Sequence, residues 1–160
     1  MVRHVAEVFA DGGASEVIVV VGCNADAVAR AAGPPEIAPI AGTAAAADAR
    51  AVIPLRIAEN AAWRLGMSSS AAAGARACSS DAEAIMICPA DLPLLRPANV
   101  AALIRGFEAL RCEHPGCAAA VAAHAGRRGH PAIVAAELRP ALEQLGSAAD
   151  DACAAAPLTL

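Results

Sequence analysis

Short apolar runs rich in β-branched residues alternate with helical patterns along most of this chain, and this alternation sets the strongest limit on its fold. Each run has the length of a buried strand, and the segments between them repeat apolar residues at helical spacing. Strands that alternate with helices predict an α/β fold with helices on both faces of a mostly parallel sheet. The predicted strands are EVIVVVG (16–22), AVIPL (51–55) and AEAIMIC (82–88), and the predicted helices include residues 2–11, 25–32, 98–110 and 137–145.

The last third of the chain adds two further apolar runs. GCAAAVAAHA (116–125) and HPAIVA (130–135) are predicted strands, and the short link GRRG (126–129) between them is typical of a hairpin. We therefore expect an antiparallel excursion at one edge of the sheet. The 160 residues fit a single domain, 1–160, and the alanine-rich tail 146–160 has little apolar bulk, a composition compatible with poor order.

Charge and composition narrow the classes of partner. The net charge of -4 and the pI near 5.5 argue against a protein that binds nucleic acid, which would present a basic face. No apolar run approaches the roughly 20 residues that span a bilayer, and the N-terminal segment is charged, so we expect a cytoplasmic protein. The six cysteines are scattered without a CxxC pair, which favours small core or loop thiols over a metal site.

An acid follows the third predicted strand in the stretch IMICPADLPLLRP (85–97). In open α/β sheets, ligands bind beyond the carboxyl ends of the strands, which is where Asp91 would lie. A carboxylate there can hold Mg²⁺ against nucleotide phosphates, and Pro89 and Pro93 would restrict the backbone on either side of it. The alternative is that Asp91 only starts a turn or caps the following helix.

Four stretches of the chain, in order, resemble the MobA-like nucleotidyltransferases, and most closely the molybdenum cofactor cytidylyltransferases. IMICPADLPLLRPANVAALIRGF is similar to the family's strand, acid-x-proline turn and helix. ENAAWRLGMSSSAAAGARA resembles its N-x-x-W-x-x-G-M-x-x-S loop and helix, and GRRGHPAIVAAELRPALEQL its G-x-x-G-[HN]-P-V segment. The stretches are residues 3–31, 59–77, 85–107 and 126–145.

The resemblance implies a three-layer Rossmann-like fold and a defined chemistry. Such enzymes move a nucleotidyl group from CTP or GTP to a phosphorylated acceptor such as molybdopterin and release pyrophosphate. It implies that Asp91 anchors Mg²⁺, and it raises a molybdoenzyme or its chaperone as a possible protein partner. A phosphorylated small molecule other than molybdopterin is an open alternative for the acceptor.

The resemblance also assigns residues to the two sides of the site. Gly66, Met67, Ser68 and Ser69 would line the nucleoside side, since their backbone amides stand at a predicted helix N-terminus. A plain helix-capping loop is the alternative for this stretch. His130 would act on the acceptor side, where it would form a hydrogen bond to a phosphate or to water on the metal. The alternative is that His130 has only a structural role.

The chain departs from the family pattern at both ends. The family's first strand and its loop L-A-A-G-x-S-x-R-M-G-x-x-K have no counterpart in residues 1–160, which contain no lysine, and LGSAADDA (145–152) replaces G-D-x-G-A-R. We therefore expect an unpaired edge in the middle of the sheet, and we expect residues 1–160 to bind nucleoside triphosphates weakly and to turn over little or nothing. Three hypotheses follow: a transferase whose gene starts upstream, a non-catalytic relative that binds a pterin or a protein, or an unrelated flavodoxin-like domain.

Overall fold

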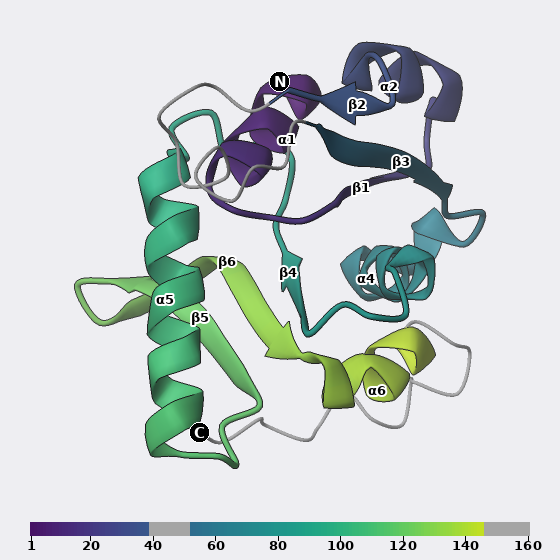
Figure 1. Cartoon of the computed structure of the whole chain (residues 1–160). Coiled ribbons are helices and arrows are strands. Elements are labelled where there is room, and N and C mark those ends of the chain that lie inside the picture. The colour runs from purple at the N-terminus through teal and green to yellow at the C-terminus, as the bar shows by residue number, and fades with distance from the viewer. Residues whose placement is uncertain (39–51, 146–160) are drawn as a thin grey trace.

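The computed structural model describes residues 1–38 and 52–145, and Figure 1 shows their arrangement. Helices and strands alternate along the chain, as the sequence pattern predicts. The strands are β1 (Val17–Val21), β2 (Glu36–Ile37), β3 (Ile53–Glu59), β4 (Ala84–Ile87), β5 (Ala119–His124) and β6 (Arg127–Ala135). The helices are α1 (Val2–Asp11), α2 (Ala25–Ala32), α4 (Met67–Ala77), α5 (Pro97–Glu113) and α6 (Arg139–Gln144), with 3-10 turns η1 (Trp63–Leu65) and η2 (Ala136–Leu138).

The strands form two three-stranded sheets, in the orders β1-β3-β2 and β4-β6-β5. Within the described residues β1 and β3 pair in parallel, whereas β2 with β3, β4 with β6 and β5 with β6 pair antiparallel. The predicted α/β class is confirmed, and the fold is consistent with a Rossmann-like nucleotidyltransferase. The share of parallel pairing is smaller than predicted because, in the ranges 1–38 and 52–145, β4 pairs with β6 alone and not with a parallel neighbour.

The two sheets end in strands with an open edge toward the middle of the molecule. β1 pairs only with β3, and β4 pairs only with β6, among the residues that the structure describes. In Figure 1, β1 is the lowest strand of the upper group, and β4 lies below it. The unpaired edge expected in the middle of the sheet is therefore present.

Helix α1 connects the cores of the two sheets. Its Ala6 and Ala10 are buried in the cluster formed with β1 and β3, whereas Val5, Val8 and Phe9 pack with Val100 of α5. The turn after α1 requires glycine, because a Cβ at Gly12 would lie 2.5 Å from the Val100 Cβ. Helix α4 packs on β1 and β3 of the first sheet, α6 packs on α4, and α5 packs on β5 and β6 of the second sheet.

Several boundaries differ from the sequence prediction. The short strand β2 lies in a proline-rich segment for which no strand was predicted, and β3 continues to Glu59 beyond the predicted end at 55. The hairpin turn falls at Ala125 and Gly126, both with positive φ, so that most of GRRG belongs to β6. The predicted tail 146–160 lies outside the described residues. No helix within the described ranges is long and apolar enough to cross a membrane.

Candidate functional site

The turn between β3 and α4 is held from inside by Asn60. This residue is only 5% exposed, and its amide nitrogen donates to the hydroxyls of Ser69 (2.9 Å) and Ser70 (3.1 Å). Its amide oxygen accepts the Ala62 N–H at 3.0 Å. The Ser69 hydroxyl also lies within hydrogen-bonding distance of the carbonyl oxygens of Ala62 (3.0 Å) and Gly66 (2.8 Å). One buried side chain thus fixes both ends of the turn.

The same turn is attached to the carboxyl end of β1. The Asn60 N–H donates to the Val21 carbonyl at 2.7 Å, which continues the β1–β3 ladder past its last pair. Gly22 follows, and a Cβ there would lie 2.5 Å from the Trp63 Cβ, so only glycine allows η1 to come this close. The turn therefore lies beyond the carboxyl ends of β1 and β3, where ligands bind in open α/β sheets.

Three of the four predicted nucleoside-side residues are exposed at the start of α4. Gly66 is the helix N-cap with φ +102, Met67 is 73% exposed, and Ser68 is exposed beside it. Ser69 differs, because its side chain is 4% exposed and directed into the Asn60 network. Its side chain holds the turn from within, and the open surface is formed by Gly66 to Ser68.

Asp91 lies in the turn after β4, as the sequence predicts. It is exposed, and no hydrogen bond or ion pair to another described residue engages its carboxylate. Its negative charge reaches Cys88: burial of the thiol first, and then the charge of Asp91, raises the pKa of Cys88 to about 11. The carboxylate is thus available to a cation, and the neighbouring thiol stays protonated at neutral pH.

His130 is exposed on β6, and its imidazole makes no hydrogen bond to another described residue. The last β4–β6 pair is Ile87 with Ala132, so counting two residues further along both strands brings His130 level with Pro89. This register sets His130 at the end of β4 that leads to Asp91. Within residues 1–38 and 52–145, no hydrogen bond or ion pair links Asp91, His130 and the Gly66–Ser68 turn to one another.

The donor set limits which metal could bind. Among the described residues no group of three or more His, Cys, Asp or Glu side chains could hold an ion. Mg²⁺ commonly keeps several waters and binds through one or two carboxylates together with substrate phosphates. A single open carboxylate at Asp91 fits an ion that arrives with a triphosphate, and does not fit a resident metal held by protein ligands alone.

A surface depression of about 380 Å³ lies at the carboxyl ends of β1 and β3. Its polar lining comes from Asn24 and Asp26 at the start of α2, from Arg30 in the last turn of that helix and from Glu59 at the end of β3. Sequence reasoning missed this depression and the buried Asn60. Both follow directly after a strand. The same position, just after a strand, made Asp91 a candidate.

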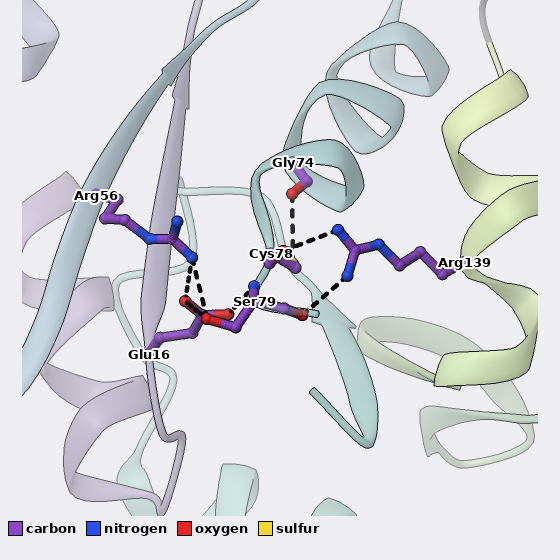
Figure 2. A network of polar contacts seen from close by, with 6 residues as sticks. All are labelled: Glu16, Arg56, Gly74, Cys78, Ser79 and Arg139. Carbon is purple, nitrogen blue, oxygen red and sulfur yellow. Dashed lines mark hydrogen bonds and ion pairs between the residues drawn. The ribbon is translucent and has the colours of Figure 1, made fainter. Parts of the chain in front are cut away.

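A separate polar network lies at the opposite end of β1 (Figure 2). Glu16 accepts the Ser79 N–H at 2.7 Å and pairs with Arg56, while Arg139 donates to the carbonyls of Cys78 and Ser79, each at 2.8 Å. Burial opposes ionisation of Glu16, but the hydrogen bonds from Ser79 and Arg56 outweigh it and lower its pKa. These contacts join β1, β3, α4 and α6 away from the candidate site.

Comparison with known proteins identifies the family of the chain. A family model described as the MobA-like NTP transferase domain matches residues 1–156. The chain is also 30% identical over 142 residues to nicotine blue oxidoreductase of Paenarthrobacter nicotinovorans. That match covers 89% of this chain and 60% of the relative, so the chain spans well under two thirds of the relative's length. With nearly its whole length matched by the family model, the chain belongs to the MobA-like NTP transferase family.

Proposed function

We propose that the protein is a nucleotidyltransferase that moves CMP or GMP from CTP or GTP to a phosphorylated acceptor such as molybdopterin. The observation that carries the proposal is the open carboxylate of Asp91 at the end of β4, in a chain of this family. Transfer of a nucleotidyl group needs positioning of two anionic substrates and neutralisation of charge at the α-phosphate. The described residues offer groups for each of these tasks.

Positioning of the nucleotide falls to the turn before α4. Gly66, Met67 and Ser68 present backbone amides at the N-terminus of an 11-residue helix, where partial positive charge favours polar and anionic groups. Asn60 and Ser69 keep this surface in place without touching the substrate. A preorganised turn loses little entropy when the nucleotide binds.

Charge neutralisation is assigned to Asp91. When Mg²⁺ is bound, it polarises the phosphate oxygens and reduces the negative charge that the attacking acceptor meets. The carboxylate of Asp91 would hold this ion beside the triphosphate. His130 would donate a hydrogen bond to the acceptor phosphate, since an exposed imidazole at this end of β6 has no described partner that competes for it.

Residues 1–160 are proposed to bind the triphosphate weakly. The chain contains no lysine, and no described arginine is placed by a hydrogen bond or ion pair at the Gly66–Ser68 turn. With no lysine and no arginine fixed at this turn by a hydrogen bond or ion pair, affinity depends mainly on the ion at Asp91 and on contacts to the nucleoside.

The test is release of pyrophosphate from CTP and from GTP in the presence of molybdopterin, with protein and nucleotide concentrated enough to measure a slow rate. Asp91→Asn should lower the rate at least tenfold, because amide oxygen replaces the anionic ligand. Asp81→Asn is the matched control, since Asp81 is also an exposed aspartate but precedes β4 at its other end. Equal rates for both variants would exclude the role assigned to Asp91.

Two other functions have support and predict different results. A non-catalytic pterin- or protein-binding module is favoured by the lack of lysine, and it would bind molybdopterin or a molybdoenzyme without releasing pyrophosphate. An oxidoreductase function is favoured by the 30% identity to a protein of that name, and it would change the absorbance of an added electron carrier.

A further inference from the structure

The side chain of Arg64 lies on an aromatic face within the candidate nucleoside turn. Its guanidinium carbon is 4.8 Å from the centroid of the Trp63 ring, which is within the range of a cation–π contact. The side chain is exposed, and within residues 1–38 and 52–145 it makes no hydrogen bond and no ion pair. The N–H donors of its planar fork are therefore available to a ligand.

The turn fixes the Trp63 residue that carries this contact. The backbone N–H of Trp63 donates to the Asn60 carbonyl at 3.2 Å, and its own carbonyl accepts the Gly66 N–H at 3.2 Å. The Cβ of Trp63 packs closely on Gly22, where an added Cβ would lie 2.5 Å from it. The ring therefore holds Arg64 at the turn that carries the nucleoside in the proposed function.

A second arginine of the chain shows how such an arrangement is completed. Arg111 lies over the Phe107 ring at 5.7 Å, and it also donates to the carboxylate of Glu137 at 2.6 Å. There the ring holds the guanidinium and a carboxylate accepts from it. Arg64 has the ring but no acceptor among the described residues. A ligand with suitable acceptors would complete the same arrangement at Arg64.

The fork of a guanidinium favours two hydrogen-bond acceptors that stand side by side. Guanine offers such a pair in O6 and N7, and cytosine offers one in O2 and N3. Adenine carries its amino donor beside both N1 and N7, and uracil has an N–H donor between its two oxygens. A fork of donors alone therefore favours guanine and cytosine over adenine and uracil.

We propose that Arg64 selects the base of the nucleotide by donating two hydrogen bonds to adjacent acceptors of cytosine or guanine. This inference rests on the proposed function, whose substrates CTP and GTP carry these two bases. The Trp63 ring keeps the guanidinium in place, which lowers the entropy lost when the base binds. Arg64 determines specificity and takes no part in the transfer step. Phosphate oxygens are the other acceptors that fit an arginine fork, and the test separates the two sources.

Isothermal titration with the Mg²⁺ complexes of CTP, UTP, GTP and ATP tests base selection. The ratio of CTP to UTP affinity and the ratio of GTP to ATP affinity cancel the contributions of ribose and triphosphate. We expect both ratios to be about tenfold in the unmodified protein, because a bidentate pair discriminates between bases by this order. Arg64→Gln should lower both ratios to about one or below, since glutamine combines a donor with an acceptor and suits adenine. Arg105→Gln, at an exposed arginine of α5, is the matched control and should keep both ratios.

The fluorescence of Trp63, the only tryptophan in the sequence, gives a second measurement on the unmodified protein. CTP should change this fluorescence, and the change at equal CTP concentration should be smaller in Arg64→Gln. Circular dichroism of both variants checks that the fold is intact.

The outcomes distinguish this inference from the proposed function. Ratios near one in the unmodified protein, ratios unchanged in Arg64→Gln, or no response of the Trp63 fluorescence to bound CTP would overturn base selection alone. An equal loss of affinity for all four nucleotides in Arg64→Gln would indicate a phosphate contact and would also overturn it. Absence of binding by every nucleotide at millimolar concentration would overturn the proposed function together with this inference.

Discussion

Replacing Asn60 by alanine tests the claim that one buried amide builds the nucleoside-side turn. The substitution removes hydrogen bonds to Ser69 at 2.9 Å and Ser70 at 3.1 Å, and it removes the acceptor of the Ala62 N–H at 3.0 Å. The backbone bond from residue 60 to Val21 is unaffected. The perturbation is therefore confined to the inside of the turn.

The expected cost follows from the number of bonds and from burial. Each hydrogen bond contributes about 0.5–1.5 kcal/mol net, and buried groups left without a partner cost more, so Asn60→Ala should lose about 2–4 kcal/mol of unfolding free energy. Ser70→Ala removes one of the three bonds and should lose about 1 kcal/mol. For a chain of this size, about 2–4 °C of melting temperature per kcal/mol predicts a drop of about 4–16 °C for Asn60→Ala.

Urea unfolding followed by circular dichroism measures both variants and their double mutant. Because Asn60 and Ser70 share a bond, the double mutant should lose less than the sum of the two single losses. Amide exchange should quicken in residues 62–69 of Asn60→Ala at urea concentrations where the protein is folded. A loss below about 0.5 kcal/mol, or strict additivity, would refute the reasoning.

Three further predictions concern stability and thiol chemistry. Gly12→Ala should lose about 1–3 kcal/mol of unfolding free energy, because the new Cβ overlaps α5. Gly106→Ala should gain about 0.5–1 kcal/mol, because this glycine lies within α5 with open space around it. Urea midpoints that rank the two variants the other way would contradict the packing. Because the folded protein lowers the pKa of Glu16, its carboxylate stabilises the fold fully above the ordinary glutamate pKa of 4.5, and this stability is lost as pH falls through the lower pKa of the folded state. Glu16→Gln should therefore make the urea midpoint depend less on pH in the acid range. An unchanged dependence would contradict this role of Glu16. Cys88, with a pKa of about 11, should react with iodoacetamide at pH 8 at least tenfold more slowly than the exposed Cys23. Mass spectrometry of peptides measures both rates, and equal rates would contradict the burial of Cys88.

Much of the fold is readable from local pattern. Runs such as VIVVV in β1 and IMIC at the end of β4 are β-branched or apolar throughout, which predicts strands. Glycine and proline in the segments between them mark where helices and strands end. Strand β2 was missed because two residues between prolines form a strand only through pairing with β3. Pairing depends on tertiary structure, which a local pattern does not contain.

The candidate site divides in the same way. Asp91 was predictable because its place after an apolar run is a feature of the sequence alone. The interior role of Ser69 was not, because neighbouring serines at the start of a helix look alike until the chain turns back on Asn60. The surface depression beside Glu59 likewise depends on how β3 and α2 meet.

Asp91 is proposed to hold Mg²⁺ against the nucleotide. Isothermal titration of CTP, with Mg²⁺ and with EDTA, into the unmodified protein, Asp91→Asn and Asp81→Asn measures this coupling without requiring turnover. Mg²⁺ should strengthen CTP binding at least tenfold, about 1.4 kcal/mol, in the unmodified protein and in Asp81→Asn, and should have no effect in Asp91→Asn. An equal effect of Mg²⁺ on all three proteins would contradict the claim.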